Sequence, residues 1–201
     1  LGAPPILLFG NEGQKAKYLP AIASGQSIAA FALTEAEAGS NVANIKTTAE
    51  LVGDEYILNG TKQWITSAGE ADLYTVVAVT DQTKGSRGAT VFIVEKGTPG
   101  MSFGSKEKKL GIRASSTREV IFQDCRVPKE NVLGKPGQGF IITMRTFERT
   151  RPGIGAQAVG IGTGALEYAF DFARGRRQFD QPISSFQIIQ HKLADMATRL
   201  E

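Results

Sequence analysis

Hydrophobic and polar positions change their spacing along the chain, and these changes divide it into three zones. Residues 1–26 carry loop signals at Pro4-Pro5 and Pro20 and an amphipathic stretch, residues 14–23, that predicts a short helix. From residue 27 to about residue 126, apolar runs alternate with clusters of Gly, Asp and Ser, as is typical of strands and turns. Strands are expected at residues 28–33, 47–52, 55–58, 73–79, 90–94 and 119–122. These runs predict an antiparallel barrel or sandwich.

From residue 137 onward the pattern becomes helical, because apolar side chains return every three or four residues. The positions that set this period are Phe140, Met144, Phe147, Leu166, Phe170 and Ala173. Two long helices are expected. Pro152 interrupts the first, and a proline there predicts a kink or a helix start beside Arg151. Ser184-Ser185 can cap the start of the second helix.

Composition narrows the classes of function. The chain has 201 residues, 41% of them hydrophobic and 21% charged, with a formal net charge of +3. No apolar run approaches the roughly 18 residues of a membrane span, so membrane insertion is not expected. Basic residues form no stripe with interleaved aromatics, which argues against a nucleic-acid partner. The single cysteine, Cys125, and the single histidine, His191, cannot form a disulfide or a soft-ligand zinc site, and a reducing, cytosol-like compartment is expected.

Three motifs between residues 31 and 69 carry most of the chemical information. They are FALTEAEAGSN at residues 31–41, GDEYILNG at residues 53–60 and KQWIT at residues 62–66. Small residues and hydroxyls at turns can supply hydrogen-bond donors, and glycine permits a close approach of the backbone to a ligand. Residues 38–41, taken alone, indicate only a surface turn. The three motifs in this order and at this spacing resemble the flavin site of the acyl-CoA dehydrogenase family.

The resemblance covers nearly the whole chain and implies its fold class. It implies an α+β multidomain protein with a middle antiparallel β-barrel or sandwich domain flanked by helical domains. The expected boundaries are residues 1–28 for the end of an N-terminal helical domain, 29–128 for the β-domain and 129–201 for the first helices of a C-terminal bundle. Because the family is nearly twice as long as this chain, we interpret the chain as an internal fragment of such a protein.

The same resemblance implies FAD as cofactor. Phe31, Leu33 and Thr34 would lie along the isoalloxazine ring, Trp64 would stack beside it, and Thr66 would hydrogen-bond near N5. Other residues would reach the diphosphate or the FAD of a neighbouring subunit. The complete set is Phe31, Leu33, Thr34, Gly39, Ser40, Trp64, Ile65, Thr66, Arg176, Gln178, Phe186 and Gln187. Two alternatives stay open: Trp64 as a buried β-sheet tryptophan, and the basic residues near Arg176 as a complement to a helix dipole.

Four positions are implied to bind the acyl-CoA substrate: Ser40, Glu148, Thr150 and Arg151. Some branches of the family place the catalytic carboxylate where Thr150 stands, so here the base is expected beyond Glu201. No residue of the chain is therefore predicted to be the base. An ion pair between Glu148 and Arg151 on a helix surface is an equally simple explanation of that spacing.

Other motifs are discounted. Gly160–Ala165 fits the dinucleotide fingerprint G-x-G-x-x-A, and a second match starts at Gly153, but neither follows a strand. Small residues on a closely packed helix face explain both. Ser105–Lys108 fits S-x-x-K without its companion motifs and indicates a solvated loop.

The resulting hypothesis is a flavin-dependent oxidoreductase of fatty acid β-oxidation that desaturates an acyl-CoA thioester at its α,β bond. A carboxylate would take the α-proton, flavin N5 would take the hydride, and electron-transfer flavoprotein would accept the electrons. A homo-oligomer, either dimer or tetramer, is expected, located in the cytoplasm or in the mitochondrial matrix of a eukaryote. Residues 109–117 and 190–196 favour the short- or medium-chain branch. The alternatives are an oxygen-using flavoenzyme of the same fold, either an acyl-CoA oxidase or a flavin monooxygenase, and a non-catalytic CoA- or nucleotide-binding protein that lacks the base.

Overall fold

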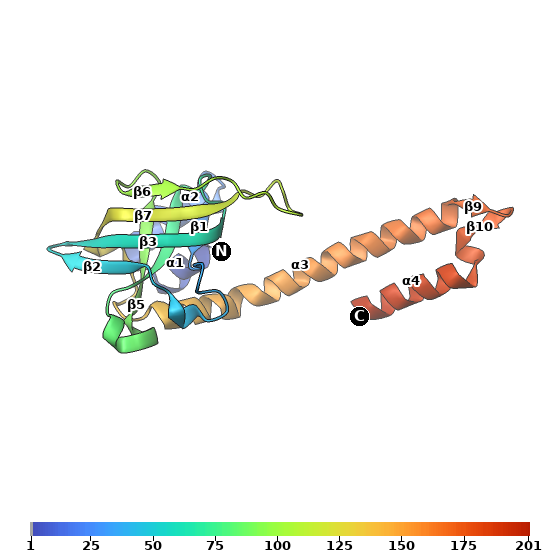
Figure 1. The fold of residues 1–201 in the computed structure, drawn as a ribbon. Coiled ribbons are helices and arrows are strands. Elements are labelled where there is room, and N and C mark those ends of the chain that lie inside the picture. The colour runs from blue at the N-terminus through green and yellow to red at the C-terminus, as the bar shows by residue number, and fades with distance from the viewer. Residues whose placement is uncertain (1) are drawn as a thin grey trace. The chain divides into compact units, whose positions relative to one another are not determined.

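The structure is a computed structural model that describes residues 2–201 (Figure 1). Contacts within the chain divide it into two compact units, Leu1–Glu148 and Arg149–Glu201. The first unit contains two short helices, an eight-stranded sheet and the beginning of a long helix. The second unit contains the remainder of that helix, a small hairpin and one further helix.

The chain begins with two helices, α1 (Ala3–Phe9) and α2 (Glu12–Ala23). The prolines of Pro4-Pro5 stand in the first turn of α1, where backbone N–H groups have no partner inside the helix, so proline is tolerated there. Asn11 and Gln14 form a capping box that starts α2, and Pro20 lies inside this helix. The helix at residues 14–23 is therefore confirmed, while the loops expected at Pro4-Pro5 and Pro20 are wrong.

Eight strands form one continuous sheet in the order β6-β7-β3-β2-β4-β5-β8, with β1 paired to β4 outside this path. The strands are β1 (Ala29–Ala32), β2 (Thr48–Val52), β3 (Glu55–Thr66), β4 (Leu73–Val79), β5 (Ala89–Glu95), β6 (Met101–Phe103), β7 (Thr117–Pro128) and β8 (Val132–Leu133). Most neighbours are antiparallel, as expected, but β1 runs parallel to β4, and β2 meets β4 in one parallel pair. The predicted combination of a β-sheet domain with helical parts is confirmed.

Strand β4 separates two hydrophobic cores, because successive side chains of a strand point to opposite faces. Tyr74 and Val76 belong to one core, which includes Phe92 of β5. Leu73 and Val77 belong to the other, which also includes residues from outside the sheet. Those residues are Ile6 of α1, Tyr18 of α2 and Ile142 of α3. Burial on both faces explains why β4 and β5 are almost continuously apolar.

Strands β3 and β7 are each twelve residues long and pair along their length (Figure 1). The register shifts between Leu58 and Gly60 and again between Lys62 and Ile65. Polar residues follow Leu58 in the sequence, which is why the pattern predicted a strand that ended there. The second shift leaves Gln63 and Trp64 opposite one residue of β7, which is a β-bulge.

Helix α3 (Gly139–Gly175) begins in the first unit and is continuous past Pro152, so a helix start beside Arg151 is wrong, while the alternative of a kink there stays a prediction. A hairpin of β9 (Arg177–Gln178) and β10 (Gln181–Pro182) leads to α4 (Gln187–Leu200). Phe186 stands at the N-cap of α4 and makes no side-chain cap, so Ser184-Ser185 do not cap it as expected. The two predicted helices themselves are confirmed.

The dinucleotide-like glycines of residues 160–165 lie in the interior of α3, which excludes the strand-turn-helix setting of such a motif. A Cβ atom added to Gly162 would lie 2.6 Å from Leu200 Cδ2 of α4. Close helix packing therefore accounts for Gly162 alone. Nothing lies within 4 Å of a Cβ atom added to Gly153, Gly160 or Gly164, so the packed helix face expected for both glycine motifs is wrong for these three residues within this chain. No helix within residues 2–201 combines the length and the apolar character that crossing a bilayer requires.

Gly60 is a position where a side chain has no room. Its φ is +147°, and an added Cβ would lie 2.6 to 2.8 Å from Oγ1, Cα and Cβ of Thr47. We expect Gly60→Ala to lower the free energy of unfolding by about 1–3 kcal/mol because the neighbouring backbone must shift. Gly111→Ala is the control, since nothing lies within 4 Å of its added Cβ. Urea unfolding of both variants measures the difference, and equal stability of the two would contradict this account of Gly60.

Candidate functional site

A cavity of about 220 Å³ in the first unit joins two of the sequence motifs. One side comes from β1 and the residues that follow it, and the other from the end of β3. Phe147 of α3 also lines it, with its ring centroid 6.0 Å from that of Phe31 at an angle of 81°. The lining residues are Ala29, Ala30, Phe31, Leu33, Thr34, Trp64, Ile65, Thr66, Ser67 and Phe147. Six residues predicted to contact the flavin thus meet at one place.

Several polar groups of this cavity have no protein partner. Within residues 2–201, neither the hydroxyls of Thr34 and Thr66 nor the indole N–H of Trp64 forms a hydrogen bond. Such groups ordinarily find a partner in protein, solvent or ligand. The cavity therefore offers free donors beside apolar and aromatic walls, which suits a flat, partly polar ligand.

Trp64 occupies the β-bulge of β3 in a strained conformation. Its φ is +53°, a left-handed value that costs about 1–2 kcal/mol for a residue with a Cβ. The residue is 57% exposed, so the alternative of a buried β-sheet tryptophan is wrong. Strain of this kind persists where the surrounding structure enforces it, commonly at ligand sites.

Behind the cavity lies a buried ion pair between Glu35 and Lys62, with 2.6 Å between Oε1 and Nζ. Lys62 is fully buried and Glu35 is 5% exposed. Lys62 Nζ also donates to the Leu33 carbonyl at 3.1 Å, and the Gln63 N–H donates to the Thr34 carbonyl at 2.8 Å. The start of the bulge is thus tied directly to the residues that form the other side of the cavity.

Electrostatics keep this pair ionised at neutral pH. Burial lowers the pKa of Lys62 to about 8, and the neighbouring carboxylate opposes that shift. Burial alone would raise the pKa of Glu35, but the charge and hydrogen bond of Lys62, together with donors from Thr47 and Lys46, hold it below its usual value.

Gly39 and Ser40 are exposed in the turn after an isolated bridge between Glu35 and Ala38, and neither lines the cavity. Glu148, one of the predicted substrate residues, is exposed on α3, and its carboxylate lies 3.7 Å from Arg145. Thr150 is half-buried and Arg151 is exposed on α3, in the second unit. The roles predicted for these residues toward a diphosphate or acyl-CoA stay predictions.

The other predicted FAD residues gather around the connection between α3 and α4. Arg176 directly follows the last residue of α3, and its carbonyl accepts a hydrogen bond of 2.8 Å from the Ile183 N–H. Gln178 lies on β9, and Phe186 and Gln187 begin α4. Arg176, Gln178 and Gln187 are exposed, and Phe186 is half-buried. The hairpin therefore brings four residues that are separated in sequence to one end of the second unit.

Comparison with known proteins identifies the family of this chain. Residues 30–125 match the acyl-CoA dehydrogenase middle domain and residues 137–201 match the acyl-CoA dehydrogenase C-terminal domain. The chain belongs to the acyl-CoA dehydrogenase family. An acyl-CoA dehydrogenase of Bacillus subtilis is 51% identical over all of the chain and 53% of the relative. The human mitochondrial short-chain specific acyl-CoA dehydrogenase is 48% identical over 98% of the chain and 48% of the relative.

Solved structures of acyl-CoA dehydrogenases and related proteins have the same fold. The butyryl-CoA dehydrogenase of Megasphaera elsdenii has a TM-score of 0.95 and is 47% identical, over 98% of this chain and 52% of that one. A chain in the structure of the electron transferring flavoprotein of Acidaminococcus fermentans has a TM-score of 0.97 and 52% identity, over 100% and 53%. The prolyl acyl carrier protein oxidase AnaB has a TM-score of 0.94 and 41% identity, over 98% and 52%. The chain spans about half the length of these relatives.

Sequence reasoning missed several residues in and around this cavity. Glu35 and Lys62 lie within the quoted motifs, but charged side chains in loops and strands ordinarily face solvent. No flavin contact is predicted from the sequence for Phe147 or Ser67, although both line the cavity. The available signal was that Glu35 adjoins a predicted flavin residue and that Lys62 lies two positions before Trp64.

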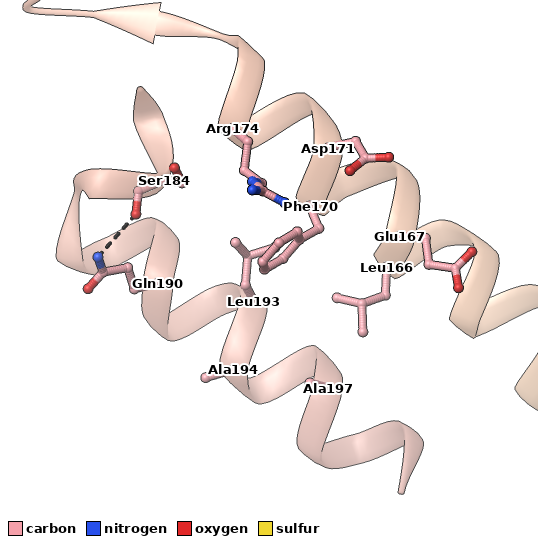
Figure 2. A pocket seen from close by; sticks show the side chains of 10 residues that line it. All are labelled: Leu166, Glu167, Phe170, Asp171, Arg174, Ser184, Gln190, Leu193, Ala194 and Ala197. Atoms are coloured by element: carbon pink, nitrogen blue, oxygen red, sulfur yellow. Dashed lines mark hydrogen bonds between the residues drawn. The ribbon is translucent and has the colours of Figure 1, made fainter. Parts of the chain in front are cut away.

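A second, larger hollow of about 990 Å³ lies between α3 and α4 (Figure 2). Leu166, Phe170 and Leu193 face one another across it, and at one end the Gln190 side chain donates to the Ser184 carbonyl at 3.1 Å (Figure 2). Its lining includes none of the predicted FAD or substrate residues. The larger hollow is therefore not the place where the predicted residues meet.

The lowered pKa of Glu35 predicts a dependence of stability on pH. Because the folded state favours the carboxylate, the unfolded chain binds the proton first as the pH falls. The stabilisation is complete above the usual pKa of 4.5 and is lost as the pH falls through the lower, folded-state value. In Glu35→Gln we expect a smaller loss of unfolding free energy below about pH 4.5. Urea unfolding at stepped pH tests this, with the exposed Glu50→Gln as control; identical pH slopes for wild type and Glu35→Gln would exclude this linkage.

Proposed function

We propose that the full-length protein is an FAD-dependent acyl-CoA dehydrogenase that introduces an α,β double bond into an acyl-CoA thioester. The observation that carries the proposal is the cavity, in which two motifs of the family meet and present donors without a protein partner. Membership of the acyl-CoA dehydrogenase family supports the same conclusion. The relatives include a butyryl-CoA dehydrogenase, which favours a short acyl chain.

This cavity would hold the isoalloxazine ring of FAD, a proposal supported by its aromatic and apolar walls beside free hydroxyl donors. Phe31, Leu33, Thr34, Trp64, Ile65 and Thr66 would hold the ring. The hydroxyls of Thr34 and Thr66 would donate to its polar edge, and the indole of Trp64 would screen it from water. When bound, FAD accepts the hydride that leaves the β-carbon of the substrate. Preorganised donors would favour the negative charge that the ring gains, without reorganisation of solvent.

Further residues would complete the FAD site. Gly39 and Ser40 would approach the diphosphate through their backbone and hydroxyl groups. Arg176, Gln178, Phe186 and Gln187 would contact the FAD of a neighbouring subunit, which requires a homo-oligomer, either dimer or tetramer. Their exposure and their common location at the hairpin of β9 and β10 support this role.

Substrate would lie near Ser40, Glu148, Thr150 and Arg151. A carboxylate must take the α-proton, and a threonine hydroxyl at Thr150 cannot serve as that base at neutral pH. We therefore assign the base to a part of the protein outside these 201 residues. Electron-transfer flavoprotein would take the electrons, as the likeness to a chain in such a structure suggests.

The proposal extends to organisation and location. Residues 1–28 would end an N-terminal helical domain, residues 29–128 would form the middle domain, and residues 129–201 would begin a C-terminal helical bundle. The protein would act in the cytoplasm, or in the mitochondrial matrix of a eukaryote, and the human relative is named as mitochondrial.

An oxygen-using flavoenzyme is the second candidate, because the chain is 41% identical to an acyl carrier protein oxidase of the same fold. The same cavity would hold the ring in both cases. The two candidates differ in whether oxygen or a protein partner reoxidises the flavin.

We expect anaerobic addition of butyryl-CoA or octanoyl-CoA to the FAD-loaded protein to bleach the flavin absorption band. The substrate that bleaches it faster indicates chain length, because both the proton and the hydride must leave a correctly placed acyl group. Fast recovery of the band on admission of oxygen would favour the oxidase. Absence of FAD from the purified, FAD-supplemented protein would contradict the proposal.

Thr66 gives a more local prediction. Thr66→Val removes a hydroxyl of the cavity and should weaken FAD binding by about tenfold, the effect of one hydrogen bond to a ligand. Thr61→Val is the matched control, since Thr61 is also an exposed threonine of β3 but lies outside the cavity lining. Titration of the apoprotein with FAD, followed by flavin fluorescence, measures both. Equal affinities of the two variants would remove Thr66 from the site.

A further inference from the structure

Glu35 and Lys62 are positioned by more contacts than a simple ion pair has. The Glu35 carboxylate accepts hydrogen bonds from four donors. They are the Lys46 N–H at 2.5 Å, the Thr47 N–H at 3.0 Å, the Thr47 hydroxyl at 2.6 Å and Lys62 Nζ at 2.6 Å. Both charges are buried, and every contact is charge-assisted, which makes the arrangement well defined in position.

Two successive carbonyl groups of the cavity backbone, those of Leu33 and Thr34, accept hydrogen bonds from this part of β3. Lys62 Nζ donates to the Leu33 carbonyl, and the next residue, Gln63, donates its N–H to the Thr34 carbonyl. Both donors come from the residues that lead into the bulge at Trp64. The two sides of the cavity are therefore fixed relative to one another by the buried lysine and its neighbour.

The peptide between Leu33 and Thr34 has a further property. The described chain contains no cis peptide bond, so the Thr34 N–H points away from the Leu33 carbonyl that Lys62 holds. Among residues 2–201 this N–H has no hydrogen-bond acceptor, and both residues line the cavity. A cation bonded to the carbonyl polarises the peptide and strengthens its N–H as a donor.

We propose that Glu35 and Lys62 are positioning residues of the flavin site, which hold the Leu33–Thr34 peptide so that its N–H is presented to the cofactor as a polarised donor. The inference rests on the proposed function. Lys62 acts through this peptide, and Glu35 acts through Lys62, so neither needs to touch the flavin. The ligand chemistry addressed is an electron-rich oxygen or nitrogen edge that becomes more negative on reduction.

A purely structural role would predict a different response to substitution. A buried ion pair is weak support for stability, because desolvation of two charges offsets their attraction, whereas loss of one partner leaves the other charge uncompensated. Removal of both charges should therefore restore part of the stability. It cannot restore the donor on the Leu33 carbonyl.

The test uses Lys62→Met, Glu35→Gln and the double variant in the full-length protein. Urea unfolding measures stability, and titration of each apoprotein with FAD measures affinity. We expect Lys62→Met to weaken FAD binding by about tenfold or more, the effect of one charge-assisted hydrogen bond. The double variant should unfold at higher urea than Lys62→Met yet bind FAD just as weakly. Its bound flavin should also have a more negative reduction potential than that of the wild type.

Val127→Ala is the matched control, because Val127 is buried in the core of β7 and lies outside the cavity lining. It should lose stability while its FAD affinity stays within about threefold of the wild type. A double variant that regains wild-type FAD affinity together with stability overturns the inference, and so does an unchanged affinity in Lys62→Met. If Lys62→Met does not fold, the FAD affinity of the double variant alone tests the inference. A wild-type protein that binds no FAD would instead refute the proposed function.

Discussion

A buried ammonium group connects the two sides of the candidate site. Lys62 lies on β3, and its two acceptors, Glu35 and the Leu33 carbonyl, lie in the segment that follows β1. These strands are not neighbours in the main order of the sheet, since β1 pairs with β4 outside that path. Without this ammonium group, the backbone hydrogen bond from Gln63 to Thr34 would be the polar contact left between the two sides.

The sheet supplies the rigid support for that link. Strand β4 is buried on both faces and shares its side chains between two cores, so it cannot move without disturbing both. Strand β1 pairs with it over four residues and then runs directly into Leu33 and Thr34. A ligand site on a segment anchored in this way can hold donors in fixed positions, which electrostatic preorganisation requires.

The parts of the fold that the sequence predicted are those in which burial dominates. Strand β4 was expected at its observed bounds because a short, continuous apolar run between turn residues is typical of a strand that is buried on both faces. Helices α3 and α4 were expected because apolar side chains recur there every three or four residues. Strand β3 was expected to end at Leu58, since the residues after it are polar and owe their strand conformation to pairing with β7. Lys62 was missed for a related reason: no pattern of apolar residues indicates a lysine whose charge is neutralised by a partner 27 positions earlier.

Trp64 is the only tryptophan of the chain, and it lies in the lining of the cavity with more than half of the residue exposed. Tryptophan fluorescence from these 201 residues therefore reports on the surroundings of Trp64 alone, because no second tryptophan contributes to it. Any ligand that covers the indole changes its contact with water and, if the ligand absorbs light as a flavin does, quenches it. The residue whose backbone is strained to reach this position thus gives the chain a built-in optical probe of occupancy.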